Sequence, residues 1–135
     1  MALELTIVTP AGAAYAGPVD GVVLPGTEGD FGVLPDHERF LCPLRVGEVQ
    51  IQKDGSTVYA SVADGFADVS SEAVAVLVDS CELGGDIDTA RAELALQRAE
   101  QGLSELGSAP DDEARLADFE AAVARARNRL AVSQR

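Results

Sequence analysis

The chain has 135 residues, 47% of them hydrophobic and 24% charged, as expected for one ordinary globular domain or a small domain with an appendage. Its formal net charge of -13 argues against autonomous binding to nucleic acid or anionic lipid. No apolar run approaches the roughly 18 residues of a membrane span, and the N-terminus lacks the basic and apolar regions of a signal peptide, so we expect neither.

Residues 1–85 show the pattern of β-strands, with apolar residues alternating along short runs that turn signals separate. They hold 11 of the 13 glycines and five of the six prolines, and no helical period long enough for a βαβ crossover. Such a series of short strands is typical of a sandwich or barrel, and we expect an antiparallel β-sandwich. The expected strands lie near residues 3–7, 19–24, 49–53, 56–62 and 73–78.

Two of these runs carry more specific predictions. Asp54-Gly55 separates two alternating runs, which predicts a β-hairpin with a type I′ turn, because both central residues of that turn need positive φ. The run over residues 73–78, AVAVLV, is almost continuously apolar, which predicts a strand buried on both faces.

Composition and charge change at Gly84-Gly85, a natural hinge because glycine reaches backbone angles that other residues avoid. Residues 1–85 carry a net charge of -10, whereas residues 86–135 carry -3 and contain 12 alanines. We therefore expect two domains, with boundaries 1–85 and 86–135, in an α+β fold.

The second part predicts two helices that form an antiparallel hairpin, joined by a loop over residues 107–111. Asp86 or Asp88 can cap the first helix, and Asp111 can cap the second.

Each helix carries one narrow apolar stripe, rich in alanine, which buries little area and predicts a weakly held hairpin. Gly102 interrupts the first helix at a cost of about 1 kcal/mol relative to alanine. The stripes consist of Ala92, Leu96, Ala99, Leu103 and Leu106, and of Leu116, Phe119, Val123, Ala126 and Leu130.

The inventory of reactive residues argues against a metal centre and against an enzyme. Cys42 and Cys81 lie far apart without CxxC partners, so we expect two free thiols in a reducing compartment. His37, the single histidine, has no His or Cys at metal-ligand spacing, so no metal ligands are expected. No phosphate-binding glycine loop is present. A free-standing enzyme and a generic sandwich adaptor stay open as alternatives.

Three motifs, in this order on the expected architecture, make the chain similar to the ε subunit of F-type ATP synthases over essentially its whole length. Residues 29–37, GDFGVLPDH, resemble the family's loop ending in G-x-x-P-x-H. Residues 87–92, IDTARA, resemble its I/L-D-x-x-R-A motif at the first helix. Residues 125–130, RARNRL, resemble the arginine-rich end of its second helix.

The resemblance implies a non-catalytic rotor subunit of the central stalk that binds the γ subunit and the c-ring. It implies coupling of proton flow to ATP synthesis, and a helical hairpin that either folds back or extends into the catalytic head, where it inhibits ATP hydrolysis. Such a subunit is peripheral to an energy-transducing membrane, on its cytoplasmic or stromal face. The alternative is an ATP-sensing module with nucleotide-dependent regulation as its main role, which titration of the chain with ATP would distinguish.

The loop over residues 29–37 is where the resemblance implies contact with the rotor. It implies contact of Glu28 and Asp30 with the c-ring and a position of His37 near the rotor interface. The chain departs from the family after this histidine, with Glu38-Arg39 in place of Ala-Pro, so the next strand is expected to start differently.

The second motif implies a nucleotide site in some bacterial members of the family. Its residues here would be Ile87, Asp88, Arg91 and Ala92, with Arg98 and the second-helix arginines Arg125 and Arg129 on the phosphates. Asp118 stands where the family has a further phosphate-binding arginine, which weakens anion binding, so no cofactor is expected and regulatory ATP is doubtful. The alternative for Asp88 and Arg91 is a helix cap and an (i, i+3) ion pair.

The third motif forms a basic cluster in an acidic chain, which favours an acidic partner surface. The resemblance supplies one, an acidic segment of the catalytic β subunits. Arg125 and Arg129 share one helix face and are the expected contacts in the extended state. In the compact state we expect both arginines to face water, and the alternative is a solvated basic face throughout.

Overall fold

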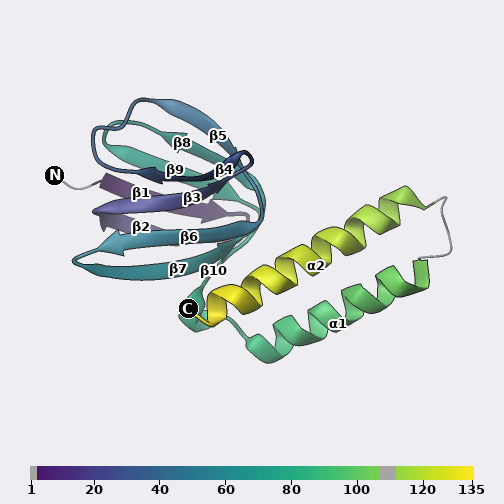
Figure 1. The fold of residues 1–135 in the computed structure, drawn as a ribbon. Coiled ribbons are helices and arrows are strands. Elements are labelled where there is room, and N and C mark those ends of the chain that lie inside the picture. Colours follow the sequence, from purple (N-terminus) through teal and green to yellow (C-terminus); the bar gives the residue numbers. More distant parts are fainter. Residues whose placement is uncertain (1–2, 107–111) are drawn as a thin grey trace.

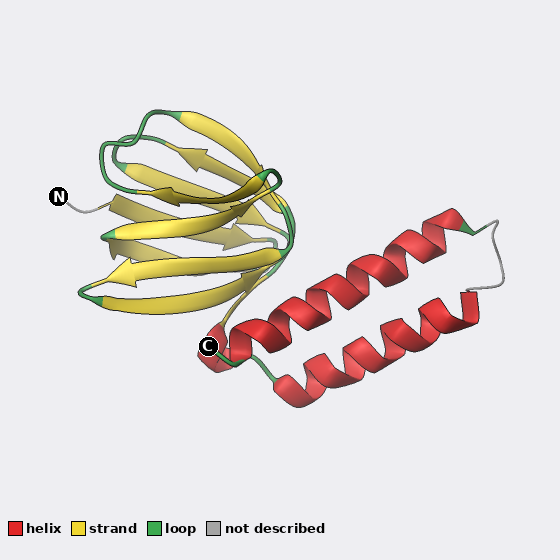
Figure 2. Cartoon of the chain, viewed as in Figure 1, coloured by secondary structure: helices red, strands yellow, loops and turns green. Residues whose placement is uncertain are grey.

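The computed structural model describes residues 3–106 and 112–135, and in these ranges the expected α+β fold is confirmed. Ten strands form a β-sandwich that closes almost into a barrel, and two helices follow it (Figure 1). Figure 2 shows the helices side by side as a hairpin that projects away from one end of the sandwich. The loop expected over 107–111 lies outside the described residues.

The strands hydrogen-bond in the order β10-β7-β6-β3-β5-β8-β9-β1-β2, with β4 paired to β3 alone. All pairs are antiparallel except β1 with β9, which run parallel. The bounds are β1 Leu3–Thr9, β2 Gly12–Val19, β3 Gly21–Gly26, β4 Gly29–Val33, β5 Phe40–Leu44, β6 Gly47–Lys53, β7 Ser56–Val62, β8 Gly65–Val69, β9 Ala73–Val78 and β10 Cys81–Leu83.

The core fills the inside of the sandwich and follows the alternation expected from the sequence. In β1, for example, Leu3, Leu5 and Ile7 are fully buried, while the intervening side chains point outward. The β6–β7 hairpin is also confirmed, since Asp54 has φ 52° and Gly55 has φ 79°, both in the left-handed region that a type I′ turn requires.

Strand β9 is buried on one face only, so the prediction of burial on both faces was wrong. Val74, Val76 and Val78 point into the core, whereas Leu77 is 55% exposed. The apolar residues of the outward face therefore lie at the surface.

The hairpin consists of α1, Thr89–Leu106, and α2, Glu113–Ser133, and a 3₁₀ turn, η1 Gly84–Asp86, leads into it. Asp88 caps α1, since its carboxylate accepts a hydrogen bond from the Arg91 amide at 3.1 Å. Asp112, rather than the expected Asp111, caps α2 and accepts from the Arg115 amide; Asp111 itself lies outside the described residues.

The two helices approach closely because Gly102 leaves room for an aromatic ring. A Cβ atom at Gly102 would lie 2.4 Å from the Phe119 ring. Most of the expected stripe residues are buried or half-buried, but Leu116 is 40% exposed and does not belong to the stripe. Against the sandwich, α2 touches β6, β7 and η1, and Figure 1 shows that this contact lies at its C-terminal end.

Candidate functional site

The turn between β3 and β4 carries two of the residues expected at the rotor interface. Glu28 and Asp30 are both exposed, and Gly29 between them has φ 134°, which favours glycine. Asp30 forms an ion pair with Arg45, at the end of β5, and both side chains stay about half exposed. Glu28 has no ion pair among the described residues. The two carboxylates therefore differ, since Asp30 is neutralised within the chain and Glu28 is not.

His37 lies on the next connection, between β4 and β5. Its Nδ1 atom lies 3.0 Å from the Glu38 carbonyl oxygen, and its ring centroid lies 5.0 Å from that of Phe40. Phe40 in turn meets Phe31 of β4 edge to face at 5.5 Å. The sequence did not single out Phe40, which starts β5 and ties the histidine to β4.

A row of exposed apolar side chains crosses four neighbouring strands on the outer face of the sandwich. Phe66 of β8 pairs with Leu77 of β9, and Leu77 pairs with Val8 of β1. Pro43 of β5 pairs with Phe66 on the other side. We call Val8, Pro43, Phe66 and Leu77 the apolar row. Of these, Val8 is 38%, Phe66 53% and Leu77 55% exposed.

The apolar row lies in a shallow hollow of about 650 Å³, and two acids, Asp64 and Asp79, also line it. Contiguous exposed apolar side chains rimmed by polar groups are typical of an interaction surface. Sequence analysis missed this surface, although the continuous apolar run of β9 was the signal for it. A strand that is apolar on both faces is either covered by its own chain or left for a partner to cover.

The residues of the expected nucleotide motif differ in burial. Ile87 and Ala92 are buried, whereas Arg91 and Arg98 are exposed on α1. Asp88 acts as the cap described above, and the (i, i+3) ion pair with Arg91 does not form in this structure.

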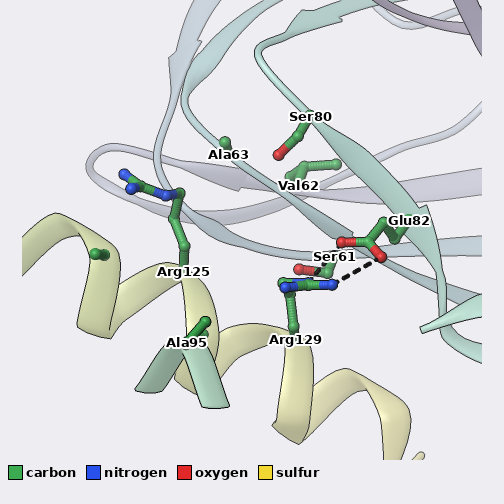
Figure 3. Close-up of a pocket in the computed structure, with 10 residues that line it drawn as sticks. Ser61, Val62, Ala63, Ser80, Glu82, Ala95, Arg125 and Arg129 are labelled. Carbon is green, nitrogen blue, oxygen red and sulfur yellow. Dashed lines mark hydrogen bonds and ion pairs between the residues drawn. The ribbon is translucent and has the colours of Figure 1, made fainter. Parts of the chain in front are cut away.

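The two arginines expected at the catalytic head line a cavity of about 210 Å³ between α2 and the sandwich. Figure 3 shows Arg129 reaching across to Glu82 of β10, while the guanidinium of Arg125, one turn earlier, points away from Glu82. Arg125 is exposed, as expected for the compact state. The expectation that Arg129 also faces water was wrong, because its side chain is only 21% exposed and pairs with Glu82.

Asn128 and Arg129 fasten α2 to the sandwich. The Asn128 amide donates to the Gly47 carbonyl and to the hydroxyl of the buried Ser61, both at 2.8 Å. Arg129 Nη2 donates to Glu82 at 3.1 Å, and its Nε lies 2.6 Å from the other carboxylate oxygen. That second approach is an ion-pair contact without hydrogen-bond geometry, so Nε keeps no well-formed hydrogen bond.

Arg135, the C-terminal residue, adds a third contact. It forms two hydrogen bonds of 2.9 Å with the Glu48 carboxylate, and its guanidinium lies 4.9 Å from the centroid of the Tyr59 ring. These hydrogen bonds, and the charge of Glu48, raise the pKa of Arg135 above its ordinary value. We call Asn128, Arg129 and Arg135 the polar latch. The sequence showed a basic cluster here but not that it binds the chain's own sandwich.

Cys81 lies beside Glu82 on β10. Burial, and to a lesser extent the charge of Glu82, raises the pKa of the Cys81 thiol to about 11, so it stays protonated at neutral pH. Both cysteines are free thiols.

Across residues 3–106 and 112–135, no group of three or more His, Cys, Asp or Glu side chains could hold a metal ion. None of the helices there combines the length and the hydropathy needed to cross a membrane.

Comparison with family models matches both parts of the chain. Residues 2–84 match the model described as ATP synthase, Delta/Epsilon chain, beta-sandwich domain. Residues 86–134 match the model described as ATP synthase, Delta/Epsilon chain, long alpha-helix domain. Together the two models span nearly the whole sequence.

Curated relatives agree with these models. The chain is 42% identical over 127 residues to the ATP synthase epsilon chain of Nitratidesulfovibrio vulgaris, covering 94% of this chain and 95% of the relative. It is 38% identical over 133 residues to the ATP synthase epsilon chain of Halalkalibacterium halodurans, covering 98% of both.

Solved structures resemble the fold at lower identity. A chain of the Euglena gracilis mitochondrial ATP synthase, OSCP/F1/c-ring, superposes with a TM-score of 0.77 at 23% identity, over 94% of this chain and 78% of that one. A chain of the Tetrahymena thermophila mitochondrial ATP synthase, central stalk and c-ring, gives 0.60 at 16% identity, over 97% and 96%.

Proposed function

This chain belongs to the ε-subunit family of F-type ATP synthases, and from that premise we propose that it is a non-catalytic rotor subunit. In this role it binds the γ subunit and the c-ring, couples proton flow to ATP synthesis, and inhibits ATP hydrolysis through its two helices. It works at the surface of an energy-transducing membrane, on the cytoplasmic or stromal face, held there by the complex.

The apolar row is the observation that carries the proposal. A sandwich that buries its apolar side chains inward leaves four of them in register across one outer face, and neither helix covers them. Burying apolar area stabilises a complex by about 25 cal/mol per Å² before the costs of association. We assign this face to the γ subunit. The acids at its rim, Asp64 and Asp79, favour basic residues on the facing surface.

The β3–β4 turn is the part of the sandwich we assign to the c-ring. Because Arg45 already neutralises Asp30, the exposed carboxylate of Glu28 is the charge available to the ring loops. The ion pair holds the turn against the end of β5 and orients it. An exposed pair of this kind contributes about 0–1 kcal/mol to stability, so its role is to position the turn.

Nucleotide sensing takes second place among the proposed functions, because the arginines expected on the phosphates are either exposed or already paired. Arg91 and Arg98 are exposed on α1, while Arg129 is engaged by Glu82. The cavity beside Arg129 has about 210 Å³, below the roughly 300–1,000 Å³ of typical small-molecule sites.

The apolar row offers a test with a closely matched control. Val8 belongs to the row and is 38% exposed, and Val58 on β7 lies outside the row and is 42% exposed. We expect Val8→Asp to weaken binding to the γ subunit of the same synthase by more than about tenfold, because a desolvated interface does not accept an unpaired carboxylate. Val58→Asp should bind γ as the wild type does.

The measurement is surface plasmon resonance with purified γ, and circular dichroism melting confirms that both variants fold. Equal binding by Val8→Asp and the wild type would show that γ docks elsewhere. An equal loss of γ binding in both variants would mean that any added surface charge on the sandwich weakens binding, and that the apolar row has no special part in it.

A further inference from the structure

Arg129 has a partner in this structure, and that partner belongs to the chain itself. Both carboxylate oxygens of Glu82 lie against the guanidinium, at 2.6 Å and 3.1 Å, and the two side chains are only 21% and 35% exposed. A guanidinium stays charged at all ordinary pH values, and a charge-assisted hydrogen bond from it to a carboxylate is stronger than a neutral one. The proposed inhibitory contact would require the same group to meet an acidic surface of the catalytic head.

Arg125 differs from Arg129 although the two share a helix face. Arg125 is exposed, and among the described residues no carboxylate forms an ion pair with it. Contact of Arg125 with an acidic partner therefore breaks no ion pair of its own, whereas contact of Arg129 breaks its pair with Glu82. The difference is visible in Figure 3, where only Arg129 reaches β10.

We propose that Glu82 competes with the catalytic head for Arg129. This inference rests on the proposed function. While Arg129 lies against Glu82 on β10 it cannot reach an acidic surface of the catalytic head, so the inhibitory contact requires this pair to break. Glu82 thereby sets how readily the hairpin leaves the sandwich.

The neighbouring contacts of α2 are coupled to the Arg129 pair. Asn128 sits next to Arg129 and donates to Gly47 and Ser61, so lifting Arg129 off β10 also removes the amide from a buried hydroxyl. Substitutions shift such an equilibrium only through their different effects on the two states. Loss of the Glu82 charge destabilises the docked state, because Arg129 is then partly buried without a counterion, and does not touch the extended one.

Substitutions of Glu82 and of Arg129 should therefore change the inhibition of ATP hydrolysis in opposite directions. In reconstituted synthase with the full-length chain, Glu82→Gln should inhibit ATP hydrolysis at a concentration about fivefold lower than the wild type. Arg129→Ala should relieve inhibition instead, because it removes the group that both states need. Asp54→Asn, an exposed acid in the β6–β7 turn, is the matched loss of one charge and should behave as the wild type.

Amide hydrogen exchange on the free chain reports docking without any partner. In Glu82→Gln, the backbone amides of the last two turns of α2 should exchange faster than in the wild type. The amides of the sandwich core should exchange at the wild-type rate. The exchanged pair, Glu82→Arg with Arg129→Glu, should protect α2 again but fail to inhibit, since it restores the pair and removes the positive charge from the helix.

The outcomes separate the two levels of the account. If the wild-type chain does not inhibit hydrolysis, the proposed inhibitory function fails, and the competition with it. If the wild type inhibits but Glu82→Gln inhibits equally or less, the competition is wrong while the proposed function stands. Unchanged exchange in Glu82→Gln would also overturn it, because Glu82 would then not hold the helix.

Discussion

Asn128 shows how one side chain can fix where a helix lies. Its amide bridges a backbone carbonyl of β6 and a hydroxyl of β7 that is only 6% exposed. Ser61 and Asn128 are separated by 67 positions, so neither residue alone indicates the contact. Leaving a buried hydroxyl without a hydrogen-bond partner costs more free energy than the hydrogen bond contributes when it forms. The Asn128 contact therefore acts mainly by disfavouring other placements of α2.

Asn128→Ala should destabilise the docked helix by about 1–3 kcal/mol, because Ser61 and the Gly47 carbonyl lose their donor. The measurement is amide hydrogen exchange over the C-terminal half of α2. Arg127→Ala is the control, since Arg127 is the exposed neighbour on the same helix and should cost under about 0.5 kcal/mol. Equal destabilisation by the two variants would mean that the Asn128 contacts do not stabilise the docked helix.

Residue types and spacing predicted which side chains carry charge but not which of them meet. The i, i+4 spacing correctly placed Arg125 and Arg129 on one helix face. It could not show that β10 would bring Glu82 under the second arginine only, because that depends on where a different element ends. For the same reason Arg45 gave no sign that it would pair with Asp30, 15 positions away.

At the scale of elements, the packing of the hairpin depends on the short distance between its two helices. Three of the six residues buried on these helices are alanine, and Gly102 stands at the position where the Phe119 ring crosses. The sequence presented Gly102 only as a weak point of α1. The structure gives it a function, because the helices could not pack at this distance with a larger residue there.

Gly102→Ala should therefore destabilise the chain, although alanine is the better helix former by about 1 kcal/mol. The added methyl would overlap the Phe119 ring, and overpacking of this kind costs about 1–3 kcal/mol. Urea denaturation followed by circular dichroism at a helical wavelength measures it. Gly85→Ala, where a Cβ meets nothing within 4 Å, should stay close to wild type. A more stable Gly102→Ala chain would show that the ring moves aside freely.

Local chemistry explains why the strands were predictable. Alternation with a period of two and the Asp54-Gly55 turn act within a few residues, so the sequence alone predicted the β6–β7 hairpin. The two faces of β9 were not predictable in this way. Both faces are apolar, and only the arrangement of β8, β9 and β1 decides which of them the chain itself covers.

At the scale of the whole molecule, the hydrophobic core belongs to the sandwich. Its buried cluster runs from Leu3 to Val78 and includes no helical residue. The hairpin joins the sandwich through the polar latch and a narrow contact with η1. A domain with its own core folds alone, so the sandwich should keep its structure without the helices.

This division assigns assembly to one part and regulation to the other. The apolar row and the β3–β4 turn both lie within residues 1–85, and the arginines proposed to inhibit lie within residues 86–135. Removing the hairpin should therefore separate the two roles instead of abolishing both.

The most direct test of this account is ATP synthesis by membranes whose synthase contains residues 1–85 in place of the full-length chain. Binding of the fragment to γ and circular dichroism of the free fragment are measured in parallel. We expect the fragment to fold, to bind γ, and to support proton-coupled synthesis at the wild-type level, while hydrolysis loses its inhibition. A fragment that folds but neither binds γ nor restores coupled synthesis would contradict the assignment of assembly to the sandwich.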